Sequence, residues 1–432
     1  MSNPAGIFCS LLLLLPCVPA YTSESSPLLA FPGAEGFGRF ATGGRGGAVY
    51  HVTNLGDRGP GTFREAVSQS NRTVVFDVGG VIRITNRVSV SPNVTIAGQT
   101  APGDGVVVYG NGVSFSGANN SITRHVRFRM GVHGDAGKDA AGIANGHDLI
   151  FDHVSVSWGR DENFSINGPV TNVTFQNCLI AQGLHPHSAG GLIQTSGGVS
   201  ILRTLYADNH TRNPKVKGVN QFVNNVVYNW GGGGCYILGD SESASFANVM
   251  NNHFISGPNT KASTFSRGNL NFHLYAAGNF QDANRNGMLD GEVVPRSGYG
   301  TVSWQEKPFD YPAVTLLSAG DALNWVIRQA GASLHRDEVD QRLIQELASY
   351  GKLGEIIARE TDPPMNGVGT VRGGPIKPDT DQDGMPDEWE LAHGLDPKDP
   401  SDRNQSGADG YTQLEIYLNS LVASSVTSEK TH

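Results

Sequence analysis

One short pattern recurs along the middle of the chain and constrains its fold more than any other feature. Each unit is an alternating apolar and polar run, a polar corner that often contains asparagine, and a second apolar run, as in residues 149–156, 173–180, 220–227 and 246–254. The units begin about 25 residues apart, and no helical pattern separates them, which excludes βαβ units. A solenoid explains this pattern, because each coil buries its inward face only by stacking on its neighbours.

Asparagine at the corners has a physical reason in such a solenoid. It tolerates the left-handed backbone conformation of a tight bend, and its amide can join a hydrogen-bonded ladder from coil to coil. A β-sandwich also has recurring strands and turns, but the repeated corner favours a parallel β-helix. Few helix formers accompany the abundant glycine and the β-branched residues, so the sequence predicts an all-β fold.

The flanking segments give the expected organisation of the chain. Residues 1–20 have the layout of a signal peptide, with an apolar run too short to span a bilayer. An apolar strand or a membrane anchor is the alternative for this segment. Residues 21–360 are expected to form the β-helix domain, with a helical cap at 61–68 and flanking helices at 321–329 and 337–350. A Pro/Gly linker follows at 361–378, and an acidic tail at 379–420.

Charge and cysteine content narrow the partners and the compartment. The formal net charge of −9 argues against nucleic acid as a partner, and no later segment is long enough for a membrane helix. We therefore expect a secreted, extracellular monomer. Beyond the leader only Cys178 and Cys235 remain, and they either pair or lie buried as free thiols. Glycosylation sequons, which fit a secreted glycoprotein, occur at Asn71, Asn93, Asn119, Asn163, Asn172, Asn209 and Asn404.

The acidic tail carries a calcium-loop pattern. Its carboxylates follow the spacing of an EF-hand loop, with Gly384 at the sharp turn, and a disordered acidic tail is the alternative. We expect a structural calcium site with no part in chemistry. A weaker loop follows at 402–415, and a third at 282–290 lacks the last carboxylate, so it is equally compatible with calcium binding or none. The expected ligands of the tail site are Asp379, Asp381, Asp383, Asp387 and Glu390.

Several motifs resemble one known family. Residues 31–38, 43–47 and 52–66 look like the opening of family 1 polysaccharide lyases, and the chain is similar to the fungal pectate lyase C type over residues 30–290. The stretch 149–158 is similar to the family's apolar-Asp-His strand, and 212–218 resembles its Arg-x-Pro-basic-x-basic motif. The resemblance implies a right-handed parallel β-helix of the pectin-lyase-like kind. It also implies a substrate groove on one sheet, a catalytic calcium ion, and cleavage of plant cell-wall pectate by β-elimination to 4,5-unsaturated oligogalacturonates.

The same resemblance assigns roles to individual residues. Arg212 matches the family's catalytic base, and Lys215 and Lys217 stand where the family usually has substrate-binding arginine. Asp139 and Asp161 match calcium ligands. Where the family often has a further Asp, this chain has Ser165, and Glu162 is the candidate to compensate. The family's substrate-binding Lys before the next strand is missing, and His185 and His187 are the candidate substitutes.

The residue types also fit this chemistry directly. Elimination from a uronate removes the hydrogen on C5 beside a carboxylate, and a calcium ion held by Asp139, Asp161 and Glu162 would stabilise the developing charge. A guanidinium ordinarily stays protonated, but burial and nearby cations such as Lys215, Lys217 and Arg203 favour its neutral form. The alternative is that Arg212 only holds substrate while a hydroxide removes the proton.

Three other functions compete with this interpretation. A polygalacturonase on the same fold needs a paired acid and water-activating carboxylate, and no compact Asp pair is visible. A pectin lyase acting on methyl-esterified chains needs no metal-binding carboxylates. A non-catalytic polysaccharide-binding solenoid does not explain the cluster at 212–217. The pair Asp152-His153 alternates with apolar residues in a strand, which favours a structural role, as does the setting of Trp158 and Phe164.

Overall fold

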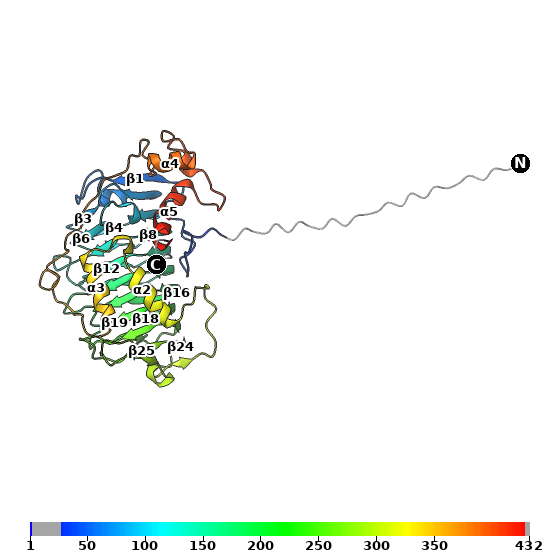
Figure 1. Cartoon of the computed structure of the whole chain (residues 1–432). Coiled ribbons are helices and arrows are strands. Elements are labelled where there is room, and N and C mark those ends of the chain that lie inside the picture. The colour runs from blue at the N-terminus through cyan, green and yellow to red at the C-terminus, as the bar shows by residue number, and fades with distance from the viewer. Residues whose placement is uncertain (2–26, 428–432) are drawn as a thin grey trace.

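The computed structural model describes Met1 and residues 27–427, with side chains up to Val422. The chain forms a parallel β-helix whose coils stack along one axis, from the blue strands at one end to the yellow-green strands at the other (Figure 1). The expected leader lies outside the described residues apart from Met1. In the described part of the chain, no helix has both the length and the apolar character that crossing a bilayer requires.

The strands form two sheets in which every pairing is parallel except that between β25 and β26. The larger sheet contains β1 (Ala48–Val52), β2 (Arg72–Phe76), β4 (Val88–Ser89), β5 (Val94–Ala97), β7 (Val113–Ser114), β8 (Ser121–Arg124), β10 (Ala141–Ile143), β11 (Gly146–Asp152), β13 (Phe164–Asn167), β14 (Val170–Gln176), β16 (Leu192–Leu202), β18 (Lys215–Val223), β20 (Tyr236–Leu238), β21 (Ser245–Met250), β23 (Phe265–Ser266), β24 (Phe272–Ala277) and β27 (Ser303–Trp304). The smaller sheet contains β3 (Gly80–Arg83), β6 (Val106–Tyr109), β9 (Arg127–Arg129), β12 (Ser155–Ser157), β15 (Leu179–Ala181), β17 (Leu205–Ala207), β19 (Val226–Tyr228), β22 (His253–Ile255), β25 (Phe280–Asp282) and β26 (Glu292–Val293).

The larger sheet is made of two columns of strands that meet at a bend. The first column runs through β4, β7, β10 and β13, and the second through β5, β8, β11 and β14. The long strands β16 and β18 belong to both columns, and their pairing shifts register between Thr195 and Val199. With the smaller sheet as a third side, each coil therefore has three faces, and equivalent positions of successive coils lie side by side.

The corner between the second column and the smaller sheet confirms the predicted role of asparagine and divides it between two neighbouring residues. Asn224 and Asn251 adopt left-handed backbone conformations, with φ of 60° and 54°. The residue after each one forms the ladder. Asn225 donates to Asn252 at 3.1 Å, and Asn252 donates to Asn279 at 2.8 Å. One asparagine therefore makes the bend while the next satisfies the buried polar groups of adjacent coils.

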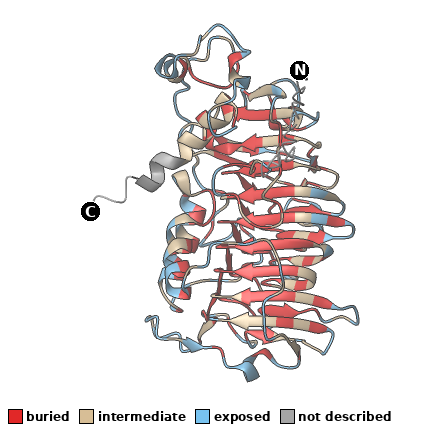
Figure 2. Ribbon diagram, turned by 90° about the vertical axis from the view of Figure 1, so that its right-hand side faces the viewer, coloured by how far each residue is buried: buried red, intermediate tan, exposed pale blue. Residues whose placement is uncertain are grey.

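The interior of the solenoid is a continuous apolar column. The strands that surround it are largely buried (Figure 2). Aromatic rings of neighbouring coils stack inside it, as Phe151 and Phe175 do with centroids 5.0 Å apart. Cys178 and Cys235 are both buried and free, which settles the question that the sequence left open. Burial raises the pKa of both thiols, so they act as small apolar groups.

Helices cover the end and one flank of the solenoid. α1 (Phe63–Ala66) buries Phe63 against the first coils, as predicted for the cap, although it is shorter than the expected 61–68. α2 (Ala319–Gln329) and α3 (Glu338–Ala348) pack on the outer face of the smaller sheet. The predicted apolar face of α3 is confirmed, since Val339, Leu343, Ile344 and Leu347 all lie in this contact. The short 3₁₀ turns are η1 (Gly98–Thr100), η2 (Arg296–Tyr299), η3 (Ser333–His335) and η4 (Asp402–Asn404).

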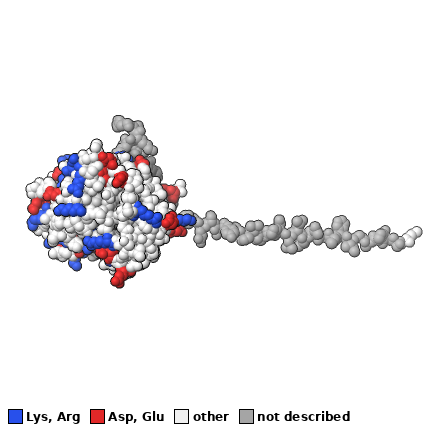
Figure 3. Space-filling model, turned by 90° about the horizontal axis from the view of Figure 1, so that it is seen from below, with Lys and Arg blue, Asp and Glu red and all other residues white. Residues whose placement is uncertain are grey.

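The tail folds back to the beginning of the solenoid. α4 (Asp387–His393) and α5 (Gln413–Thr427) lie beside the first coils, next to β1 and β8 (Figure 1). The segment before them follows the solenoid surface, where the Arg372 carbonyl accepts from the Asp104 N–H at 2.8 Å. At the end of the molecule seen in Figure 3, basic and acidic side chains are interspersed.

A buried ion network fastens α3 to the smaller sheet. Arg129, on β9, donates to Asp337 at 2.5 and 2.9 Å and to Asp340 at 2.8 Å, and all three side chains are at most 1% exposed. Burial alone would raise the pKa of Asp337, but the Arg129 guanidinium beside it lowers that pKa to about 2. Ser155 also donates to Asp340, at 2.6 Å. Such a pair is costly to break, because the remaining partner stays buried and charged.

We expect Asp337→Asn to lower the free energy of unfolding by about 3 kcal/mol at neutral pH. The folded-state pKa lies below that of the unfolded chain, so the carboxylate stabilises the fold above about pH 4, and this contribution is lost as the pH falls toward 2. Urea unfolding at several pH values measures it, with exposed Glu338→Gln as the control. Equal unfolding midpoints for Asp337→Asn and the parent chain would contradict the proposed anchoring.

Candidate active site

The predicted site residues lie just before strands of the first column, in coils that are adjacent or separated by a single coil. Asp139 precedes β10, Asp161 and Glu162 precede β13, and Arg212 precedes β18. Backbone contacts join these segments: the Ala140 N–H donates to the Glu162 carbonyl at 3.1 Å, and bridges link Glu162 to Ala189 and Ala189 to Thr211. The stacking of coils therefore brings residues more than 70 positions apart in the sequence to one edge of the solenoid.

Asp139 is held in place by two hydrogen bonds. Its Oδ1 accepts from the Glu162 N–H at 3.1 Å, and its Oδ2 accepts from the Ser165 hydroxyl. Burial raises the pKa of Asp139, and the charge of Asp161 raises it further, although the bond from Ser165 opposes the rise. Ser165, which departs from the family pattern, thus supports the Asp139 carboxylate in this chain.

Asp161, Glu162 and His187 form a second group beside Asp139. One ligand atom from each lies within 4.8 Å of the others, and His187 Nε2 is 2.9 Å from Asp161 Oδ1. The Asp161 side chain is 36% exposed, whereas that of Glu162 is 5% exposed, so the group opens to solvent on one side. Carboxylate oxygens are the donors that calcium prefers, and negative charge crowded at a partly buried place favours a cation, so these residues fit a calcium ion. His185 is exposed nearby, with its ring 5.2 Å from that of His210.

Arg212 reaches into the same group. Its Nη1 pairs with Glu162 Oε1, and its side chain remains 27% exposed. Its backbone is left-handed, with φ of 56°, an uncommon conformation for a long side chain. The structure therefore brings Arg212 to the predicted carboxylates, and Glu162 is its direct partner.

The basic residues around Arg212 are distributed differently from the expectation. Lys215 and Lys217 alternate with buried Val216 on β18 and share its outer face, and Lys215 pairs with Asp240 at 2.8 Å. The expectation that Arg203 adds positive charge near Arg212 is wrong. Arg203 follows the opposite end of β16 and pairs with Glu35 at 2.8 Å.

The tail carboxylates also converge, with one change from the EF-hand pattern. Asp379, Asp381 and Asp383 form one group, and Asp383 joins Glu390 and Asp402 in another. Burial and mutual repulsion raise the pKa of Asp383 to about 7 and that of Glu390 to about 8. The expected ligand Asp387 is absent from both groups.

The reason for the change lies in local hydrogen bonding. Asp387 begins α4, where its carboxylate accepts from the N–H and the hydroxyl of Thr380 at 2.7 and 2.8 Å. Asp402, from the weaker second loop, supplies the additional carboxylate. Glu415 of that loop pairs with Arg45 at 2.7 Å, so the second loop completes the first site rather than forming its own. In the third loop, Asn284 and Asn286 donate to Asp290 at 2.7 and 2.8 Å.

Two of the seven sequons, those at Asn163 and Asn209, lie in the interior next to the candidate site. Asn163 and Asn209 are fully buried, and Asn163 donates to Asn209 at 2.9 Å. Asn209 in turn donates to Asn213, also at 2.9 Å, so the three amides form a ladder behind the site. A glycan has no space at either position. Of the other sequons, Asn71 and Asn404 are exposed, and Asn93, Asn119 and Asn172 are partly exposed.

Sequence reasoning misses the roles of Ser165 and Asp402 at the two carboxylate groups, and it correctly assigns Trp158 and Phe164 to packing. The sequence pattern predicts no role for Ser165 and assigns Asp402 to a separate, weaker loop, whereas the structure places them beside Asp139 and in the tail site. Trp158 and Phe164 are buried, which confirms their assignment to packing. His153 Nδ1 lies 2.8 Å from Asp152, and its ring stacks on His125 with centroids 4.7 Å apart, a structural setting at another corner of the coil.

Comparison with known proteins identifies close relatives. The chain is 55% identical to a probable pectate lyase C of Neosartorya fischeri over 95% of its length and 98% of the relative. It is 57% identical to one of Aspergillus flavus, over 93% and 96%, and 53% identical to one of Emericella nidulans, over 98% of each. No family model matches.

Solved structures share the fold. A variant of a Bacillus subtilis pectate lyase has a TM-score of 0.51 and 13% identity, covering 72% of this chain and 99% of its own. A thermostable pectate lyase has a TM-score of 0.51 and 14% identity, covering 70% and 98%. At such low identity these two structures support the parallel β-helix and nothing finer.

We expect Asn163 and Asn209 to carry no glycan when the protein is produced in a eukaryotic host, because both amides are buried in the ladder. Glycopeptide mapping by mass spectrometry measures occupancy at each sequon, and exposed Asn404 serves as the comparison within the same chain. A glycan found at Asn163 on folded protein would contradict the buried placement.

Proposed function

The chain belongs to the fungal pectate lyase C family and is a lyase, and from this premise we propose that it cleaves (1→4)-α-D-galacturonan by calcium-assisted β-elimination, giving 4,5-unsaturated oligogalacturonates. The observation that carries the proposal is the convergence of Arg212 with Asp139, Asp161 and Glu162 at one edge of the solenoid. The reaction requires a base that removes the hydrogen on C5 and a cation beside the sugar carboxylate, and both have candidate residues there.

The carboxylates support calcium as the cation. Asp161 and Glu162 are the residues that would hold it, with Asp139 beside them. A bound calcium ion would supply positive charge next to the sugar carboxylate, which makes the hydrogen on C5 more acidic. The same charge would allow a protein of net charge −9 to bind a polyanion. A methyl-esterified substrate has no need of such a site, which disfavours a pectin lyase.

Arg212 is the proposed base. Removal of the C5 hydrogen needs a guanidine nitrogen that faces the sugar, whereas Nη1 of Arg212 is paired with Glu162 in this structure. The base function therefore requires the pair between Arg212 and Glu162 to open when substrate binds. In this proposal Lys217, on the outer face of β18, holds a neighbouring sugar carboxylate, and Lys215 shares that face.

We also propose where the protein acts. The leader pattern in residues 1–20 supports secretion, and a polymer of plant cell walls is met outside the producing cell. We assign the protein to the extracellular space on this basis.

The reaction is tested by following absorbance near 235 nm, where a conjugated unsaturated uronate absorbs, with polygalacturonate as substrate. Calcium should produce a rise and a chelator should abolish it. New reducing ends without the chromophore would indicate hydrolysis and overturn the proposal. An equal rate on fully methyl-esterified pectin with chelator present would favour a pectin lyase instead.

We expect Arg212→Lys to lower kcat roughly 100- to 10,000-fold, the usual contribution of a positioned general base, with a smaller change in KM. Lysine keeps a positive charge, so near-normal turnover would instead mean that Arg212 only holds substrate. Arg296→Lys, an exposed arginine at the far end of the solenoid, is the matched control and should leave kcat unchanged.

A further inference from the structure

The tail contains five carboxylates whose arrangement is unexplained by the protein alone. Three elements supply them: the loop at 379–384, α4 and η4. Oxygens of Asp379, Asp381 and Asp383 lie within 4.8 Å of one another, as do those of Asp383, Glu390 and Asp402. Asp383 and Glu390 are fully buried, and Asp402 is 3% exposed. Like charges this close repel strongly unless something of opposite charge separates them.

Several of these oxygens have no partner among the described residues. Both oxygens of Glu390 are buried without a hydrogen bond, and so is one oxygen each of Asp381, Asp383 and Asp402. Within the described chain, no ion pair joins these four side chains to a lysine or arginine, and His51 lies 3.7 Å from Asp379. Buried carboxylates are ordinarily hydrogen-bonded, paired or bound to metal, so the unpartnered oxygens indicate a missing cation.

The backbone already orients the group. N–H groups of Asp383 and Gly384 donate to Asp379 at 3.3 and 3.0 Å, and the Met385 N–H donates to Asp383 at 2.9 Å. Gly384 has φ of 95°, so the sharp turn of the loop requires glycine. These bonds occupy one side of the carboxylates and leave the unpartnered oxygens facing one another. A set of hard oxygen donors on a preformed loop suits a calcium-like divalent cation.

The same loop is packed against the first coils of the solenoid. Met385, which follows the turn, is fully buried in a cluster with Val75 and Ala97 of the first coils. From α5, Leu414 and Leu418 join this cluster. The carboxylate group and the contact with the solenoid are therefore parts of one folded unit.

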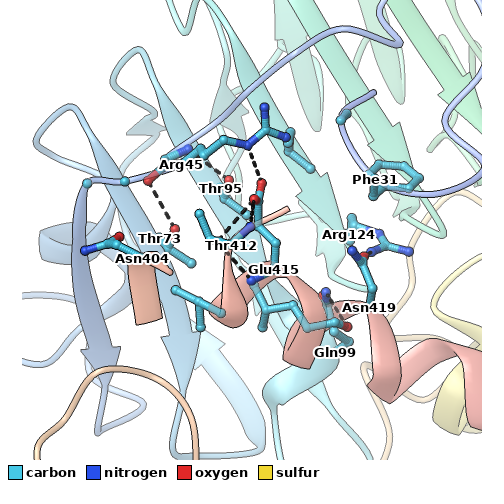
Figure 4. A pocket seen from close by; sticks show the side chains of 17 residues that line it. Phe31, Arg45, Thr73, Thr95, Gln99, Arg124, Asn404, Thr412, Glu415 and Asn419 are labelled. Atoms are coloured by element: carbon cyan, nitrogen blue, oxygen red, sulfur yellow. Dashed lines mark hydrogen bonds and ion pairs between the residues drawn. The ribbon is translucent and has the colours of Figure 1, made fainter. Parts of the chain in front are cut away.

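Polar contacts extend the attachment, as Figure 4 shows. Arg45 pairs with Glu415 of α5 at 2.7 Å, and Arg124, on β8, donates to Asn419 at 2.9 Å. The gap left between these elements has a volume of about 30 Å³. The tail thus closes tightly over the side of the first coils.

We propose that a calcium-like divalent cation bound by Asp379, Asp381, Asp383, Glu390 and Asp402 fastens the tail to the first coils of the solenoid. The cation joins the loop at 379–384, α4 and η4, which otherwise repel one another, and so shapes the surface that contacts β2 and β5. Its role is to hold the fold together, and none of its ligands belongs to the candidate active site.

The test uses the full chain freed of metal with a chelator and then titrated with calcium chloride. Isothermal titration calorimetry counts the bound ions, and thermal unfolding measures their effect. In Glu390→Gln we expect one fewer bound ion than in the parent chain. We also expect most of the calcium-induced rise in Tm to be lost, a rise of about 3 °C at a calcium concentration 100 times Kd.

Two controls make the result specific. Glu388→Gln changes an exposed neighbour on α4 that pairs with Lys377, and it should bind and unfold like the parent chain. Asp161→Asn addresses the candidate active site and should keep the tail ion together with the calcium-induced rise in Tm. Loss of lyase activity in Asp161→Asn alone would therefore bear on the proposed function and leave the tail site standing.

Asp402→Asn makes the same kind of change in a separate element, η4, so it shows whether the result in Glu390→Gln comes from a folding defect of that one variant. It should also lose one ion and the rise in Tm. The proposal is overturned if both variants bind as many ions as the parent chain, or if calcium leaves the Tm of Asp161→Asn unchanged.

Discussion

In-register parallel pairing between coils is the constraint on which the rest of the structure depends. Each coil repeats the position of the one before it, so a residue just before a first-column strand lies next to its counterparts in neighbouring coils. Asp139, Glu162 and Arg212 meet for this reason alone. A one-residue slip in any coil would turn side chains from one face of the sheet to the other and separate them. The corner asparagines, which satisfy buried groups from coil to coil, thereby also keep the site together.

The repeat made the fold predictable because its signal is local and many times repeated. Alternation fixes which residues face inward, and the corner asparagine marks each bend, so the β-helix, the cap and the apolar face of α3 could be predicted from the chain. The partners of individual charged side chains could not. Whether Arg203 lies near Arg212 depends on which end of β16 it follows, and nothing in the local pattern fixes where that long strand ends. Asp402 was missed for a similar reason, since its loop reaches the first site only through the tertiary fold of the tail.

Buried charged side chains occur in two different settings in this molecule. Between β9 and α3, the arginines of the sheet meet Asp337 and Asp340, and every charge has a partner inside the protein. In the tail the carboxylates outnumber any nearby cation among the described residues, and their oxygens are left without partners. The first arrangement is complete in the folded chain. In our proposal the second is completed by an external cation that joins the loops and short helices of the tail.

In how fully its charges are paired, the candidate active site lies between the ion network beneath α3 and the carboxylates of the tail. Glu162 is almost fully buried and has Arg212 as its partner, while Asp161 beside it is partly exposed and faces His187. A group with one internal partner and one open side can exchange that partner for a ligand at lower cost than a sealed network can, because solvent already reaches it. The contact between Arg212 and Glu162 thus joins a side chain that is 27% exposed to one that is 5% exposed, at the edge of the coil. This balance distinguishes the edge that carries the candidate chemistry from the sealed network beneath α3, where the same residue types serve only the fold.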